Sequence, residues 1–181
     1  MSSHAAPLKT EDSVLIENIR SGKTNFFAEL VKRYEGLVRT SIWNLIRDSE
    51  LMEDLVQEIF AKAYAKLGML EKACHFKVWL LQIARRHCLD HLRKKKIPVE
   101  DLDAMEAKGQ LPVVAEAFIP IKDSMMITML EHLSPLDAEL LWLRFVESVS
   151  YRDLSTITGL QESALRKRIS RGLSRLREML T

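Results

Sequence analysis

Apolar residues recur every three or four positions along the first half of the chain. One run comprises Phe26, Phe27, Leu30, Val31, Tyr34, Leu37 and Val38, and another comprises Leu51, Leu55, Ile59, Phe60 and Ala63. This spacing places the apolar side chains on one face of a helix. The pattern therefore predicts amphipathic helices here, with a further helix over about residues 77–96 after the irregular segment LGMLEKACHF.

The helical period fades between residues 97 and 123. This segment holds three prolines and a surplus of acidic side chains, with Glu100, Asp101, Asp103, Glu106, Glu116 and Asp123 against Lys108 and Lys122. Proline and unbalanced charge oppose a packed element. We therefore predict an all-α protein of two small helical domains. A tail covers residues 1–10, the first domain 11–96, a flexible acidic linker 97–123 and the second domain 124–181.

Helix ends are well marked in the second domain. Ser134 followed by Pro135 is typical of a helix start, and Ser150 followed by Asp153 repeats a capping pattern. Gly159 can adopt the left-handed conformation that ends a helix. A short helix from Ser150 and a longer one over about 162–180 therefore predict a helix–turn–helix.

One face of that longer helix is basic and rich in hydroxyl groups. With about 100° between successive residues, an apolar face carries Leu165, Ile169, Leu173, Leu176 and Leu180. The opposite face carries Ser163, Lys167, Ser170, Arg171 and Ser174, with Arg166 at its border. Small residues permit entry into a DNA groove, where Arg and Lys reach base edges and phosphates. A solvated surface helix is the alternative, but the preceding sharp turn favours DNA binding.

Two stretches of the first domain carry further candidates. In MEDLVQEIFAKAYAKL, acidic and amide side chains cluster in the first two turns, either stabilising the helix dipole or forming a docking face for a basic partner. In FKVWLLQIARRHCLDHLRKKK, Phe76 and Trp79 precede a strongly basic end. Rings stack on unstacked bases while cations hold phosphates, so this helix fits single-stranded nucleic acid. Alternatively, both rings belong to the core.

Composition narrows the classes of function. The chain has 181 residues and a net charge of only +2, so any affinity for a polyanion depends on local charge segregation. We predict a cytoplasmic protein without membrane insertion, because the chain has only two cysteines and shows neither an apolar leader nor a long apolar run. No P-loop, GxSxG or glycine-rich phosphate motif is present, so we expect neither an enzyme nor a cofactor.

Histidine and cysteine residues lie close together in the first domain. Cys74 and His75 are adjacent, and His87, Cys88 and His91 share a helix. They form neither a CxxC nor an HExxH pattern, which disfavours a metal site. A metal- or redox-responsive role is kept as an alternative.

At this point the sequence resembles a known family. The segments EDLVQEIFAKAY, VWLLQIARRHCLDHLRK and LSPLDAELLWLRFVESVSYRDLSTITGLQESALRKRISRGLSRLREML are similar to the two domains of extracytoplasmic-function sigma factors, the compact group IV of the sigma-70 family. The similarity runs in the correct order from about Asn25 to Met179. It implies a promoter-specificity subunit of RNA polymerase.

The resemblance also implies roles for particular residues. The polymerase clamp helices would be bound by Asp54, Leu55, Gln57 and Glu58. The minus-ten element, single-stranded after opening, would be bound by Phe76, Lys77, Trp79, Arg85, Arg86, Arg93, Lys94 and Lys95. The double-stranded minus-thirty-five element would be read by Gln161, Ser163, Arg166, Lys167, Ser170 and Arg171. The second domain would also dock on the polymerase flap, and an anti-sigma factor is the expected regulator.

Three positions depart from the family pattern. Arg86 stands where Asn is frequent, Lys167 where Ser is common, and Gln161 where a capping Ser is usual. The family therefore does not imply the minus-ten base preference of this chain. A stand-alone helix–turn–helix regulator is the competing hypothesis, but it leaves the features of the first domain without a role.

Overall fold

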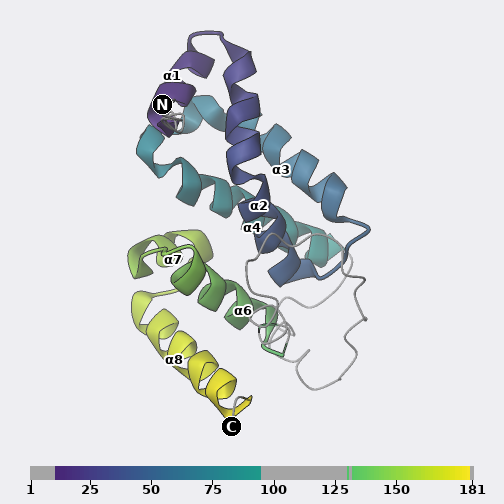
Figure 1. The fold of residues 1–181 in the computed structure, drawn as a ribbon, viewed down its shortest axis with the longest axis vertical. Helices are drawn as coiled ribbons and strands as arrows, with labels where there is room; N and C mark the ends of the chain where they lie inside the picture. Colours follow the sequence, from purple (N-terminus) through teal and green to yellow (C-terminus); the bar gives the residue numbers. More distant parts are fainter. Residues whose placement is uncertain (1–10, 95–129, 131, 180–181) are drawn as a thin grey trace, which may run out of the picture.

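Two groups of helices make up the part of the chain that the computed structural model describes, residues 11–94, 130 and 132–179 (Figure 1). The first comprises α1 (Asp12–Arg20), α2 (Phe27–Ile46), α3 (Met52–Lys66) and α4 (Phe76–Lys94), with short 3-10 turns between α1 and α2 and between α3 and α4. The second comprises α6 (Pro135–Leu141), a π-helical turn at Trp142–Val146, α7 (Tyr151–Thr158) and α8 (Glu162–Met179). No strand occurs among these residues, which confirms the predicted all-α class.

The core of the first domain surrounds α2, which contacts α1, α3 and α4. The apolar positions with helical spacing supply it, including Leu30, Val38, Ile59 and Phe60. Ion pairs join the helices at the edges of this core. Arg39 of α2 lies 2.7 Å from a carboxylate oxygen of Glu53, and Arg33 pairs with Asp12 of α1. The predicted irregular segment LGMLEKACHF contains two 3-10 turns, Leu67–Met69 and Ala73–His75.

The predicted helix ends of the second domain are confirmed. Ser134 Oγ accepts a hydrogen bond from the backbone nitrogen of Asp137 at 3.2 Å. Ser150 Oγ accepts one from Asp153 at 3.1 Å. Gly159 ends α7 with φ +77°, a conformation that glycine adopts without the steric cost of a Cβ. The helix–turn–helix is therefore formed by α7 and α8.

The apolar face of α8 differs from the predicted one near its middle. Leu165 and Ile169 are buried, but Leu173 is 40% exposed. Gly172 faces α6 instead, and a Cβ placed there would lie 3.0 Å from Leu141 Cδ1. Because Gly172 allows α8 to approach α6 closely, α8 packs with Gly172 toward α6. Leu173, the next residue, is left partly exposed. Leu180 lies outside the described residues.

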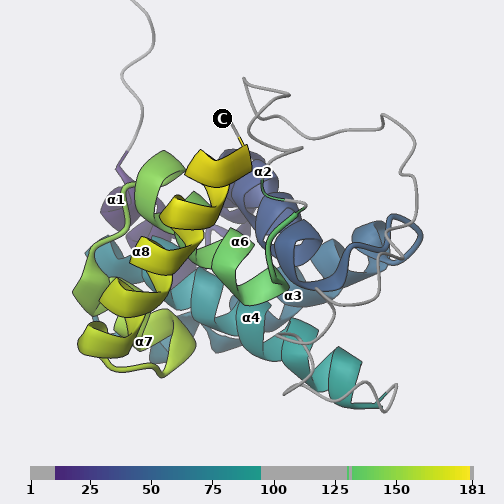
Figure 2. The same ribbon diagram turned by 90° about the horizontal axis from the view of Figure 1, so that it is seen from below.

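The two domains pack against each other along α2 and α4. Helix α6 contacts both α8 and α2, and α7 contacts α4 (Figure 2). Leu37 of α2 and Leu81 of α4 are buried in the core of the second domain. The chain segment predicted to be a flexible linker, residues 97–123, lies outside the described residues. Two separately packed domains were expected, whereas the second domain's core also includes residues of α2 and α4.

Candidate nucleic-acid and protein interfaces

The acidic surface of α3 is formed by three polar side chains on one side of the helix. Asp54, Gln57 and Glu58 are exposed, as a docking face requires. Leu55, which was predicted with them, is only 2% exposed because it packs into the first domain's core. It therefore holds α3 in place and does not reach a partner.

A buried histidine connects this acidic surface to α4. His87 Nε2 lies 2.8 Å from Glu58 Oε2, and Lys62 Nζ contacts His87 Nδ1. Burial and the nearby Lys62 ammonium lower the pKa of His87. The imidazole is therefore neutral at neutral pH, with Nδ1 accepting from Lys62 and the proton assigned to Nε2. The i, i+4 spacing of Glu58 and Lys62 shows a shared face of α3, but the sequence does not show that His87 lies between them.

The aromatic residues at the start of α4 have different environments. Phe76 is fully buried and forms edge contacts with Tyr34, with ring centroids 5.3 Å apart. It cannot stack on a base, which corrects its prediction as a nucleic-acid contact. Trp79 is half-buried, and its ring lies 5.9 Å from that of Phe76. Phe76 therefore supports the indole of Trp79 from the core side.

The basic residues of α4 are divided between the domain interface and the surface. Arg85 is only 7% exposed and pairs with Glu139 of α6, which is fully buried. Burial lowers the pKa of Arg85 to about 10, so it remains charged at neutral pH. Lys77 Nζ lies 2.7 Å from Glu147 Oε2. Arg85 therefore does not face solvent as predicted, and Lys77 is only partly exposed beside Glu147. Arg86, Arg93 and Lys94 are exposed, and Lys95 lies outside the described residues.

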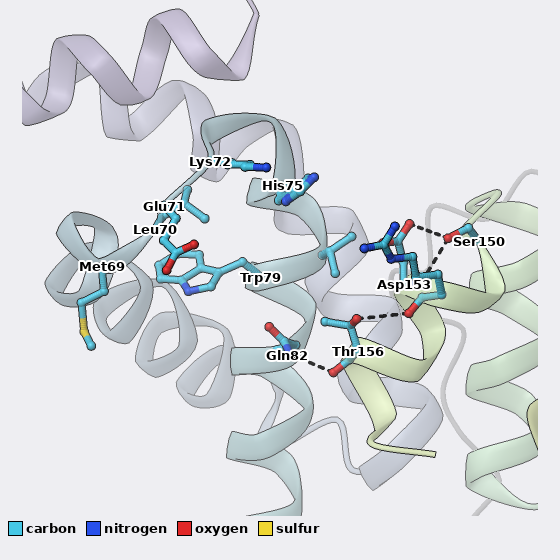
Figure 3. Close-up of a pocket in the computed structure, with 12 residues that line it drawn as sticks. Met69, Leu70, Glu71, Lys72, His75, Trp79, Gln82, Ser150, Asp153 and Thr156 are labelled. Carbon is cyan, nitrogen blue, oxygen red and sulfur yellow. Dashed lines mark hydrogen bonds between the residues drawn. The ribbon is translucent and has the colours of Figure 1, made fainter. Parts of the chain in front are cut away.

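A groove separates the start of α4 from α7 (Figure 3). Met69, Lys72 and Trp79 line it from the first domain, and Arg152 and Asp153 line it from the second. Gln82 crosses at one end, where its Nε2 donates to the carbonyl oxygen of Thr156 at 2.8 Å (Figure 3). Because the second domain supplies one wall of the groove, the groove forms only where the two domains are in contact.

The basic surface of α8 is open to solvent. Arg166, Lys167, Ser170 and Arg171 line a shallow groove, and Gln161 and Ser163 are also exposed. Arg166 is held by two neighbours: its guanidinium lies 4.1 Å from the Tyr151 ring centroid, and Nη2 is 3.5 Å from Glu162 Oε2. The predicted residues therefore share one surface, and Tyr151 is a contributor that the sequence analysis did not include.

The described residues contain no His, Cys, Asp and Glu cluster that could hold a metal ion. Cys88 is buried, and that burial raises the pKa of its thiol to about 12. The side chain of Cys74 lies outside the described part of the structure. None of the helices described is both long and apolar enough to span a bilayer.

Two protein-family models match this chain, one in each domain. Residues 30–97 match the model for "Sigma-70 region 2", and residues 124–176 match the model for "Sigma-70, region 4". Together these matches cover most of the chain. The chain belongs to the sigma-70 family. Members of this family are transcription initiation factors and not enzymes, so this sigma-70 family protein serves promoter recognition in transcription initiation.

Curated relatives of this sigma-70 protein are similar over nearly their full length. RNA polymerase sigma factor CarQ of Myxococcus xanthus is 28% identical over 169 residues, which cover 91% of this chain and 95% of CarQ. ECF RNA polymerase sigma factor SigW of Bacillus subtilis is 25% identical, covering 91% of this chain and 94% of SigW. These similarities confirm the predicted resemblance to extracytoplasmic-function sigma factors.

Solved structures with the same fold are also sigma factors. The sigma factor RpoE, in complex with the anti-sigma factor NepR from Bartonella quintana, has a TM-score of 0.68 and 24% identity. That match covers 85% of this chain and 96% of the other. CnrH in complex with the cytosolic domain of CnrY has a TM-score of 0.63 and 20% identity, covering 93% and 96%. Both likenesses establish the two-domain helical fold.

Proposed function

We propose that this sigma-70 family protein binds core RNA polymerase through α3 and directs it to promoters through α4 and α8. The observation that carries the proposal is the placement of two surfaces of opposite charge on different domains. The acidic surface lies on α3, and the basic surface lies on α8 at the far side of the second domain (Figure 1). One surface fits a basic protein partner and the other fits DNA.

The acidic surface of α3 is suited to the polymerase clamp helices. Asp54 and Glu58 offer carboxylates, and Gln57 offers an amide between them, all exposed on a helix that the buried Leu55 holds in place. Charge-assisted hydrogen bonds from basic side chains would give such a contact both orientation and affinity. Docking of the second domain on the polymerase flap is part of the same proposal.

The basic surface of α8 is suited to the double-stranded minus-thirty-five element. Arg166, Lys167 and Arg171 can reach base edges or phosphates, and the small residues Ser163 and Ser170 permit close approach of the helix to the groove. Stacking on Tyr151 limits the conformations of Arg166 before DNA arrives. Less conformational entropy is therefore lost when it binds.

The minus-ten contacts are assigned to the exposed part of α4. Arg86, Arg93 and Lys94 would hold phosphates or bases of the opened strand, and the half-buried Trp79 would offer an aromatic surface nearer the start of the same helix. Arg86 can only donate hydrogen bonds, so it favours a base that presents acceptors or an adjacent phosphate. Lys95 belongs to this proposed set by its place in the basic run, whereas Phe76 acts only by supporting Trp79.

An anti-sigma factor is the proposed regulator, and the cytoplasm is the proposed location because the polymerase acts there. Two sigma factors with the same fold have been solved with such partners, NepR and the cytosolic domain of CnrY. The partner of this chain would have to contact its α3, α4 or α8 surfaces to block polymerase or promoter.

Run-off transcription tests the proposed function. Purified protein and core polymerase are mixed with genomic fragments, and each component alone serves as a control. Discrete transcripts that need both components are expected. Binding of duplex DNA without any retention of core polymerase in a pull-down would instead support the stand-alone regulator and refute the sigma-factor proposal.

A further inference from the structure

The buried imidazole of His87 lies next to the acidic surface of α3. We propose that His87 is a positioning residue for polymerase binding: it holds the carboxylate of Glu58 in the orientation that meets core polymerase. The inference rests on the proposed role of Glu58 as a contact to the clamp helices. It goes beyond that role, because His87 belongs to α4 and is too deeply buried to meet the partner itself.

One nitrogen of the His87 ring faces the Glu58 carboxylate. His87 Nε2 lies 2.8 Å from Glu58 Oε2, and this nitrogen is shielded from water. The two atoms are at hydrogen-bond distance, although no aligned hydrogen bond joins them. A buried N–H without an acceptor costs free energy, so it favours the Glu58 rotamers that bring an oxygen into line with it. The exposed carboxylate is therefore drawn toward one position on the surface.

The other nitrogen of the ring determines which group Nε2 presents. Lys62 Nζ contacts His87 Nδ1. An ammonium can only donate, so Nδ1 accepts and the ring proton resides on Nε2. Burial and the Lys62 charge lower the pKa of His87, which keeps the ring neutral at neutral pH. The titratable groups that act on His87 are Glu58 and Lys62 of α3 and His91 of its own helix.

An exposed glutamate without support would sample several side-chain rotamers. The Glu58 side chain is 60% exposed, and within the described ranges its carboxylate has no other partner. The His87 side chain is only 10% exposed and belongs to a helix that packs on α3. A ring fixed in this way reduces the conformational entropy that Glu58 loses when polymerase binds. The acidic surface is therefore partly ordered before its partner arrives.

Substitutions at His87 separate a hydrogen-bonding role from a space-filling one. His87→Leu fills a similar volume without a donor, whereas the terminal amide of His87→Gln can donate to Glu58 and accept from Lys62. Fluorescence titration with core polymerase at pH 7.5 should show binding about three- to tenfold weaker for His87→Leu, the range expected when one more side chain must be ordered. His87→Gln should bind like wild type.

His91→Leu is the matched control for the loss of an imidazole from α4. His91 lies one turn further along the helix and, in the part of the chain that the structure describes, forms no ion pair or hydrogen bond with α3. Its substitution should leave core binding unchanged. A loss as large as that of His87→Leu would refute the inference, because any imidazole removed from α4 would then have the same effect.

A double-mutant cycle shows whether His87 acts through Glu58. Glu58→Ala should weaken core binding, and His87→Leu added to it should cause little further loss, because the carboxylate that His87 orients is gone. Equal losses from His87→Leu with and without Glu58 would mean that it acts through the fold, which would overturn the inference. Circular dichroism checks the fold of each variant. If His87→Leu loses helix content, His87→Asn replaces it, since its shorter amide does not reach the place of Nε2, and the same weaker binding is expected.

The outcomes also separate this inference from the proposed function. If Glu58→Ala binds core polymerase as tightly as wild type, the proposed clamp contact of Glu58 fails and the inference fails with it. If Glu58→Ala weakens binding but the folded His87 variant without the donor does not, the clamp contact stands and only the positioning role of His87 is refuted.

Discussion

At the scale of single residues, the environment of each charged side chain decides whether it is available to a partner. Arg85 and Arg86 are neighbours in sequence and both belong to the basic run of α4, yet one is buried against Glu139 and the other is exposed. Arg166 lies between these extremes, because it is exposed but stacked on Tyr151. Equal charge in the sequence therefore corresponds to three different roles in the structure.

Arg166 and Arg171 should carry specificity at the minus-thirty-five element. An arginine that is bidentate to guanine contributes about 1–3 kcal/mol, so its change to Ala should relax preference at one base pair by that amount. A phosphate contact would instead weaken all sequences alike. Binding selection with Arg166→Ala and Arg171→Ala measures this, with Lys32→Ala, an exposed cation of α2, as the control. Unchanged base preference and unchanged affinity in both variants would contradict the assignment.

His87 should make the folded protein less stable in mild acid. Burial and the Lys62 charge lower its pKa in the folded state, whereas an unfolded histidine titrates at about 6.5. The unfolded chain therefore binds the proton more readily. The free energy of unfolding decreases as the pH falls from about 6.5 to the pKa of His87 in the folded protein. Urea unfolding at pH 7.5 and 5.5 should show a smaller loss for His87→Gln than for wild type. The exposed His132→Gln serves as control, and equal losses in all three proteins would exclude this role.

At the scale of helices, the sequence predicts the elements well because local signals determine them. The caps at Ser134 and Ser150 and the left-handed Gly159 lie where expected. The orientation of a helix about its own axis is less local. Leu173 has the spacing of a buried residue, but α8 presents Gly172 to α6 instead. Leu55 is a different case, because its place in the apolar run predicts the buried position that the structure shows, and only the family resemblance assigned it to the polymerase contact.

Gly172→Ala should destabilise the second domain. An alanine is favoured over glycine inside a helix by up to about 1 kcal/mol. However, its Cβ would lie 3.0 Å from the buried Leu141, and overpacking costs about 1–3 kcal/mol. We expect a net loss of about 1 kcal/mol in urea unfolding. Gly68→Ala is the matched control, since nothing lies within 4 Å of its added Cβ. A stabilised Gly172→Ala protein would show that α6 and α8 are not closely packed here.

The acidic surface of α3 should bind polymerase without determining the fold. Asp54, Gln57 and Glu58 are exposed, so changing all three to Ala should alter the free energy of unfolding by only about 0.5 kcal/mol per site or less. Binding to core polymerase should fall strongly in a pull-down or a fluorescence titration. Glu17→Ala/Glu29→Ala is the control for lost negative charge. Full retention of core binding by the triple variant would exclude this surface as the contact.

At the scale of the whole molecule, the packing of the domains is the feature that the sequence could not reveal. Arg85 and Glu139 are 54 positions apart, and Arg47 and Leu133 are 86 positions apart, with the acidic segment between them. Periodicity and caps report only local structure, so they carry no information about such distant pairs. An acidic, proline-containing segment suggested independent domains, whereas Leu37 and Leu81 complete a core that belongs mainly to the second domain.

A shared core of this kind predicts that the free protein unfolds cooperatively. If Leu37 and Leu81 stabilise the second domain, its helices should not melt before those of the first. Calorimetry should then show one transition for wild type, with equal calorimetric and van't Hoff enthalpies. Glu139→Gln removes the negative charge that balances the buried Arg85, so it should weaken the contact and split the profile into two transitions. Two separate transitions in wild type would mean that the domains are independent in solution, and the contact between them would then contribute nothing to stability.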